Sequence, residues 1–128
     1  MALQRVMHVE DDESIRAVAE IALADVAGFE LLSCDSGPSA LAQAEAFAPQ
    51  LILLDVMMPQ MDGLQTLAAL RQLPGMAQVP VVFMTAKIQQ GEKQQYINAG
   101  AIAVIDKPFE PMKLGGTLSR LYQQNQTR

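Results

Sequence analysis

The chain has 128 residues, of which 50% are apolar and 18% are charged, and its formal net charge at pH 7 is −5. A chain of this length fits one domain that buries roughly two-thirds of its unfolded surface, so its core needs no metal or disulfide. The negative charge argues against nucleic-acid binding, because phosphate contacts need clustered Lys and Arg. A single cysteine, Cys34, and a single histidine, His8, exclude a disulfide framework and argue against a zinc site.

The apolar pattern continues to Tyr122 and is lost from Gln123 onward, which predicts a domain over residues 1–122 and a polar C-terminal tail over residues 123–128. No apolar run approaches the ~20 residues that a membrane span requires. Residues 1–9 lack the charged start, long apolar stretch and cleavage site of a signal peptide. We therefore expect a soluble, cytoplasmic protein that does not associate with membranes.

Short apolar segments rich in Val, Ile and Leu alternate with amphipathic segments along the chain. The apolar segments predict strands over Val6–Val9, Leu31–Cys34, Leu51–Leu54, Val79–Met84 and Ile102–Ile105. The amphipathic segments predict helices over Ser14–Val26, Ser39–Phe47, Leu64–Leu73, Gln89–Ala99 and Pro111–Gln124. Almost continuous apolar strands are typical of a sheet covered on both faces. The alternation predicts an α/β fold of five βα units, with a parallel sheet and helices on both faces.

Polar side chains follow the predicted strands at the point where function gathers in an open α/β sheet. Residues Glu10–Glu13 follow the first strand, Asp55 the third, Thr85 the fourth and Asp106–Pro108 the fifth. The acids of the first group are also explained as caps of the next helix, most readily Asp12 and Glu13. A carboxylate after the most apolar strand is harder to explain, since its burial is unfavourable without a partner.

Several carboxylates at one sheet edge repel each other, and a hard divalent cation removes that conflict. Mg²⁺ suits a site with one or two carboxylates, a carbonyl oxygen and phosphate oxygens. Lys107 and Thr85 would complete a cradle for a phosphoryl group. A carboxylate such as Asp55 is ionised at neutral pH, so it can act as a nucleophile without a general base. The residues therefore favour phosphoryl transfer without a catalytic His, Cys or Ser.

Four motifs resemble the receiver domains of two-component response regulators. They are Val9–Arg16, Leu53–Gly63, Met84–Ala86 and Asp106–Phe109, in the family's order and at its spacing, and the similarity extends from Arg5 to about Tyr122. The resemblance implies a flavodoxin-like, doubly wound (βα)5 fold with strand order 2-1-3-4-5. It also implies a signalling receiver that catalyses its own phosphorylation and dephosphorylation, and not an enzyme acting on other substrates.

The resemblance assigns a role to each motif residue. Asp55 would accept a phosphoryl group from a phosphohistidine on a partner. Asp11, Asp55 and the backbone carbonyl of Met57 would bind Mg²⁺, and Glu10 would hold the second acidic position through a metal-bound water.

Two further motif residues would act on the phosphoryl group itself. Lys107 would contact the phosphoryl oxygens, and Thr85 would move to hydrogen-bond them. The Lys107–Pro108 peptide bond would be cis, which is accessible only before proline.

The implied partners are a sensor histidine kinase or a histidine phosphotransfer protein, together with a downstream protein target or a phosphorylation-dependent dimer. We expect no direct binding of nucleic acid. The chain would be either a single-domain receiver or a receiver cut from a larger regulator.

Two positions depart from the usual pattern of the family. Val104 stands where many members carry a Tyr or Phe that follows the threonine, and a β-branched side chain cannot swing a ring inward. The output step would then depend on Thr85 and loop movement, or on a different residue. Met57 and Lys87 stand where the family tunes dephosphorylation, and the apolar Met57 predicts slow to moderate self-hydrolysis. Lys87 is expected to form a surface ion pair with an acid of the first motif.

Two alternatives remain open at this stage. A Mg²⁺-dependent phosphatase of the haloacid dehalogenase type would need a second acid two residues after the nucleophile, where this chain has Met57. A structural interaction domain with a degenerate site would not need the complete set of acids, hydroxyl and lysine. We also expect His8 to be a core residue and not a phosphoryl carrier, and Cys34 to be a small buried side chain.

Overall fold

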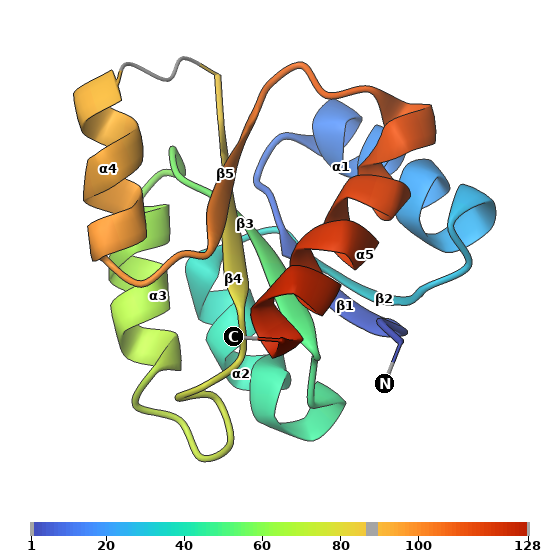
Figure 1. Ribbon diagram of the computed structural model, residues 1–128. Helices are drawn as coiled ribbons and strands as arrows, with labels where there is room; N and C mark the ends of the chain where they lie inside the picture. Colours follow the sequence, from blue (N-terminus) through green and yellow to red (C-terminus); the bar gives the residue numbers. More distant parts are fainter. Residues whose placement is uncertain (1, 87–89, 128) are drawn as a thin grey trace.

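The computed structural model describes residues 2–86 and 90–127, which form one parallel sheet between two layers of helices (Figure 1). The strands are β1 (Arg5–Val9), β2 (Glu30–Cys34), β3 (Leu51–Asp55), β4 (Val81–Thr85) and β5 (Ala103–Asp106). The helices are α1 (Glu13–Glu20), the π-helix η1 (Ile21–Val26), α2 (Gly37–Phe47), α3 (Gly63–Leu70), α4 (Gln90–Asn98) and α5 (Pro111–Gln126). The strand order is β2-β1-β3-β4-β5, and every neighbouring pair is parallel. This order confirms the predicted fold.

The two faces of the sheet bury separate apolar clusters. One cluster joins the sheet to α2, α3 and α4, with Phe83 and Leu67 among its buried members. The other joins the sheet to η1 and α5, with the fully buried Leu23 and Leu118 among its members. Figure 1 shows these two groups of helices on opposite sides of the strands. Every residue of β3 is buried, so the carboxylate at its end is surrounded by protein.

The predicted helix over Ser14–Val26 is divided in the structure. After Glu20 the chain widens into a π-helix, and the N–H of Ala27 donates to the carbonyl of Ala22 at 3.1 Å. Ala27 then packs closely against Gly115 of α5, where a Cβ atom would overlap that of Ala27. The apolar spacing of the sequence predicted one continuous helix, but in the structure Ala22 and Leu23 are buried while Ile21 and Val26 are exposed.

Other boundaries shift by a few residues. Helix α3 ends at Leu70 instead of Leu73, and the side chain of Arg71, which follows it, donates hydrogen bonds to the carbonyls of Met76 (2.9 Å) and Val79 (2.7 Å). The predicted start of α4 at Gln89 lies outside the described residues. Helix α5 continues to Gln126, and the predicted domain boundary at residue 122 stays a prediction.

Capping residues fix the helices that begin beside the sheet's carboxyl edge. Asp12 accepts a 3.0 Å hydrogen bond from the N–H of Ile15 and begins α1, as the cap interpretation predicted. Asp62 and Gln65 form a reciprocal capping box that begins α3. Both caps lie in loops that follow a strand, so they hold those loops at the sheet edge. Among the helices of the described ranges, none has the length and apolar character needed to cross a membrane.

Candidate phosphoacceptor site

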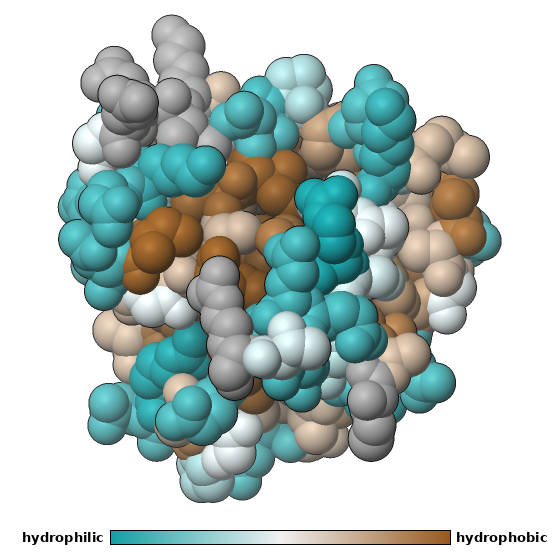
Figure 2. Space-filling view, viewed as in Figure 1, coloured by the Kyte–Doolittle hydropathy of each residue, from teal (hydrophilic) through white to brown (hydrophobic). Residues whose placement is uncertain are grey.

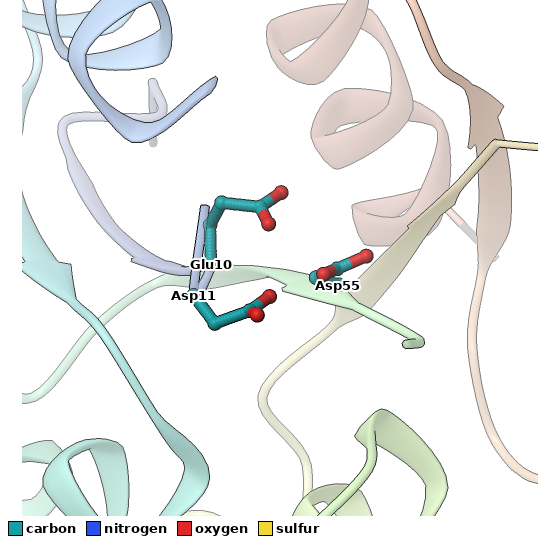
Figure 3. Close-up of side chains that lie close together, drawn as sticks. All are labelled: Glu10, Asp11 and Asp55. Atoms are coloured by element: carbon teal, nitrogen blue, oxygen red, sulfur yellow. The ribbon is translucent and has the colours of Figure 1, made fainter. Parts of the chain in front are cut away.

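Three carboxylates meet at the carboxyl edge of the sheet. Glu10 and Asp11 follow β1, Asp55 ends the neighbouring strand β3, and one oxygen from each lies within 4.8 Å of the others. Figure 3 shows the three side chains directed toward the same space. Such a group of oxygen atoms is suited to a hard divalent cation. The structure therefore brings together the acidic residues predicted from three positions in the sequence.

The carboxylates differ in their exposure to solvent. Glu10 and Asp55 are buried, with exposed fractions of 0% and 2%, whereas Asp11 is exposed at the rim. Burial raises the pKa of Glu10 to about 7, and the neighbouring Asp55 adds to the rise although Lys107 opposes it. Without a bound cation, burial and the nearby Asp55 therefore destabilise the ionised form of Glu10.

Lys107 is the cation that balances the buried acids. Its Nζ atom lies 2.7 Å from Glu10 Oε1 and donates a 2.9 Å hydrogen bond to Asp55 Oδ1. Burial alone would lower the pKa of Lys107, but the hydrogen bonds and negative charges of Asp55 and Glu10 outweigh it and raise the pKa. The Lys107–Pro108 peptide bond is cis, as the resemblance implied.

Thr85 lies at the end of β4, between the strands that carry Asp55 and Lys107. It is 5% exposed, and its carbonyl accepts a 2.9 Å hydrogen bond from the N–H of Lys107. Asp55 pairs in register with Met84, the residue before Thr85. Thr85 therefore ends the strand next to β3, which ends at Asp55.

The loop after Asp55 is held tightly against the start of α3. The N–H of Gly63 donates to the carbonyl of Val56 at 2.8 Å. A Cβ atom at position 63 would overlap the carbonyl oxygen of Asp55 and lie 2.8 Å from the Cα atom of Val56. Only a residue without a side chain fits here, so Gly63 allows α3 to begin directly against the backbone of Asp55.

Met57 is exposed between two buried neighbours. Its exposed fraction is 74%, whereas Val56 and Met58 are 4% and 8% exposed. The apolar side chain at this position therefore faces solvent, and the slow hydrolysis expected from it stays a prediction. Lys87, the second position linked to dephosphorylation, lies outside the described residues.

Arg16 of α1 is a site residue that the sequence analysis missed. Its Nη1 atom donates hydrogen bonds to the carbonyls of Glu10 (3.0 Å) and Asp11 (3.4 Å). The guanidinium therefore fixes the backbone of the acidic pair from the first turns of α1. Arg16 ends the first of the four motifs, but no role was assigned to it from the sequence, because an arginine there is also typical of a solvated helix face.

An apolar hollow of about 400 Å³ lies directly beside the site. Ile15 and Val18 of α1 line the hollow together with Pro108 and Phe109 of the segment after β5. Lys107, which contacts the acidic cluster, also lines it. Lys107 thus lines the hollow and also contacts the Asp55 carboxylate.

His8 and Cys34 are buried, as expected. His8 points into the core beneath the site with no hydrogen-bond partner on either ring nitrogen. Burial, with smaller contributions from the charges of Lys107 and Arg16, lowers the pKa of His8 to about 4, so the ring is neutral at pH 7. Cys34 is a free buried thiol. Neither residue is placed to carry a phosphoryl group.

A sheet of order 2-1-3-4-5 with acids, a threonine and a lysine at its carboxyl edge defines a phosphoacceptor domain of the α/β class. Residues 6–119 match the family model described as "Response regulator receiver domain". This chain belongs to the response regulator receiver domain family. That membership favours the receiver over the phosphatase.

Curated proteins and solved structures agree with the family. The chain is 30% identical to the alkaline phosphatase synthesis transcriptional regulatory protein PhoP of Bacillus subtilis over 96% of its length. It is 38% identical over 68% of its length to the signal transduction histidine-protein kinase BarA of Escherichia coli. It spans 50% of PhoP and 10% of BarA. The structure of the chemotaxis protein CheY4 of Vibrio cholerae superposes with a TM-score of 0.86 at 33% identity, covering 94% of this chain and 99% of that one.

Proposed function

We propose that this domain accepts a phosphoryl group on Asp55 from a phosphohistidine of a sensor kinase or a histidine phosphotransfer protein. The observation that supports this most directly is the placement of the buried Asp55 carboxylate 2.9 Å from the Lys107 ammonium within a group of three acids. Among the described residues the other buried acid, Glu10, also contacts Lys107 but lies one residue beyond the end of β1, whereas Asp55 ends β3 at the centre of the sheet.

In the proposed step, an oxygen of the Asp55 carboxylate attacks the phosphorus atom. A new O–P bond forms, the N–P bond to the donor imidazole breaks, and the released imidazole takes up a proton. Lys107 neutralises negative charge on the phosphoryl oxygens, and the Thr85 hydroxyl donates a hydrogen bond to one of them. These groups are preorganised by β3, β4 and β5, so positioning and charge provide most of the rate enhancement.

The chemistry of the donor set fits Mg²⁺. We assign the cation to Asp11 and Asp55, with the backbone carbonyl of Met57 as a third ligand and Glu10 holding it through a water. When bound, the ion neutralises the phosphoryl oxygens and relieves repulsion among the acids. The same residues would support hydrolysis of the acyl phosphate, so that the domain catalyses its own phosphorylation and dephosphorylation.

The hollow beside Lys107 suits a protein donor better than a small molecule. Its walls from α1 and from the segment after β5 are apolar, and Lys107, which contacts Asp55, also lines it. An apolar side chain flanking the donor histidine would be buried there while the imidazole faces the acceptor. Phosphorylation would then alter a surface recognised by a downstream protein or by a second copy of the chain. A cytoplasmic location is part of this proposal.

The proposal is tested by incubating the protein with acetyl phosphate and Mg²⁺ and following the intact mass. We expect an added phosphoryl group in the wild type and in Asp12→Asn, a variant of an exposed capping acid. We expect none in Asp55→Asn. An adduct that persists in Asp55→Asn, or turnover of phosphate esters without an adduct, would contradict the proposal.

A further inference from the structure

Helix α4 is attached to the rest of the domain mainly through Tyr96. Among residues 91–98, whose side chains the structure describes, Tyr96 alone is buried, with an exposed fraction of 8%. The helix is otherwise polar apart from Ile97, and it lies at the side of the sheet beside β5 and α3 (Figure 1). A helix held by one large side chain changes position when the contact of that side chain changes.

The contact that Tyr96 makes leads toward the acceptor site. Its ring packs on Phe83 of β4, with centroids 5.4 Å apart and planes tilted by 57°. Phe83 is fully buried and precedes Thr85 by two residues on the same strand. Because side chains alternate along a strand, Phe83 and Thr85 lie on the same face of the sheet.

Val104 of β5 is the register partner of Phe83 and packs against the same apolar cluster. Its side chain is short and has a restricted rotamer. The aromatic group next to Phe83 is therefore supplied by helix α4 and not by the neighbouring strand. This is the structural consequence of the valine at position 104.

The environment of Tyr96 includes the charge of a second element of the site. Burial raises the pKa of Tyr96, and the negative charges of Glu92 and Asp62 raise it further. Asp62 caps α3 at the end of the loop that follows Asp55. Tyr96 thus packs on β4, which carries Thr85, and its hydroxyl is influenced by the acid at the end of the loop after Asp55.

We propose that Tyr96, through its contact with Phe83, couples phosphorylation of Asp55 to the position of α4. The inference rests on the proposed function, because it concerns how a phosphoryl group at that site is transmitted. Displacement of Thr85 toward the phosphoryl group shifts the end of β4, and the Phe83 ring moves against Tyr96. The surface that changes includes the half-buried side chains of β5, where Figure 2 shows a hydrophobic area beside α4.

The test compares amide chemical shifts with and without Mg²⁺ and beryllofluoride, a mimic of the phosphoryl group. In the wild type we expect changes at Val56 and Thr85 near the site and at Ile97 and Asn98 of α4. In Tyr96→Leu the changes near the site should remain, and those in α4 should fall several-fold. Tyr122→Leu is the matched control, because Tyr122 is 7% exposed but packs in the opposite cluster under α5.

Two further variants separate coupling from a general loss of structure. Phe83→Leu removes the ring contact from the strand side and should weaken the α4 response in the same way. Tyr96→Phe keeps the ring and should retain the response. An unchanged α4 response in Tyr96→Leu and Phe83→Leu would overturn the inference. An absence of changes at Val56 and Thr85 in the wild type would instead contradict the proposed function.

Discussion

The Lys107 ammonium donates a hydrogen bond of 2.9 Å to the Asp55 carboxylate across the width of an intervening strand, β4. It also lies 2.7 Å from the buried Glu10 carboxylate. One cation therefore stabilises two acids that would otherwise repel each other in a poorly solvated site. The same cation is placed to meet a phosphoryl group once Asp55 carries one.

Replacing this lysine should reveal how strongly the two acids depend on it. In Lys107→Met, two buried carboxylates lose their partner, and we expect the free energy of unfolding to fall by about 3 kcal/mol in the presence of a chelator. Added Mg²⁺ should restore part of the loss, because the cation replaces the missing charge. Urea unfolding with and without Mg²⁺ measures both effects. A loss below about 1 kcal/mol, typical of an exposed pair, would contradict this account.

Gly63 should be required for phosphoryl acceptance, because a Cβ atom there would displace the backbone of Asp55. In Gly63→Ala we expect the rate of phosphorylation by acetyl phosphate to fall at least ~10-fold, since small displacements of reacting groups have large effects. Intact-mass time courses measure the rate.

Two other glycines provide matched controls for this variant. Gly116 has open space around it, so Gly116→Ala should leave the rate unchanged. In Gly115→Ala the new Cβ atom would overlap Ala27, which is not a residue of the site. This variant should be less stable, but the folded protein should keep the wild-type rate of phosphorylation. A rate loss in Gly115→Ala equal to that in Gly63→Ala would show that lost stability, not position, explains the effect.

His8 should make the metal-free protein less stable in acid. The pKa of His8 is lowered from 6.5 to about 4 in the folded state, so the unfolded state binds an extra proton between these values. Above pH 6.5 His8 is neutral in both states and does not change the free energy of unfolding. As the pH falls from 6.5, protonation of His8 in the unfolded state lowers the free energy of unfolding, by on the order of 3 kcal/mol at pH 4. We expect His8→Val to reduce the difference in unfolding free energy between pH 7 and pH 4. An identical pH dependence in the variant would contradict the assignment.

A polar group at Met57 should shorten the lifetime of the phosphorylated protein. The exposed thioether offers no strong hydrogen bond to an attacking water, whereas the amide of Met57→Asn can orient one. We expect the half-life of the phosphoryl group to fall several-fold, as followed by mass after removal of the phosphodonor. Met112 is equally exposed at 74%, so Met112→Asn is a control that should leave the half-life unchanged. Equal half-lives for the wild type and Met57→Asn would show that the side chain at position 57 does not control the rate of hydrolysis.

Much of the fold could be predicted because each strand ends where the apolar pattern meets a polar residue. Asp55 was conspicuous for this reason, since it follows four fully buried residues of β3. The convergence of Glu10, Asp11 and Asp55 followed from the parallel sheet, whose strands share one carboxyl edge.

Other features depend on packing that a single sequence does not contain. The π-helix after Glu20 ends beside Ala27, which packs closely against Gly115 of the distant helix α5. Arg16 acts through hydrogen bonds to backbone carbonyls, and the residue types in a sequence do not reveal such bonds. Tyr96 stands in a polar helix with almost no amphipathic pattern, and its role depends on Phe83 of a distant segment.

The most direct test of the central claim is to locate the phosphoryl group itself. An acyl phosphate on an aspartate is reduced by borohydride to homoserine, and peptide mapping by mass spectrometry then identifies the residue. After treatment of the wild type with acetyl phosphate and Mg²⁺, we expect homoserine at position 55 and unmodified Asp11 and Glu10. Reduction at another carboxylate, or none anywhere in a protein that has gained a phosphoryl group, would contradict the account.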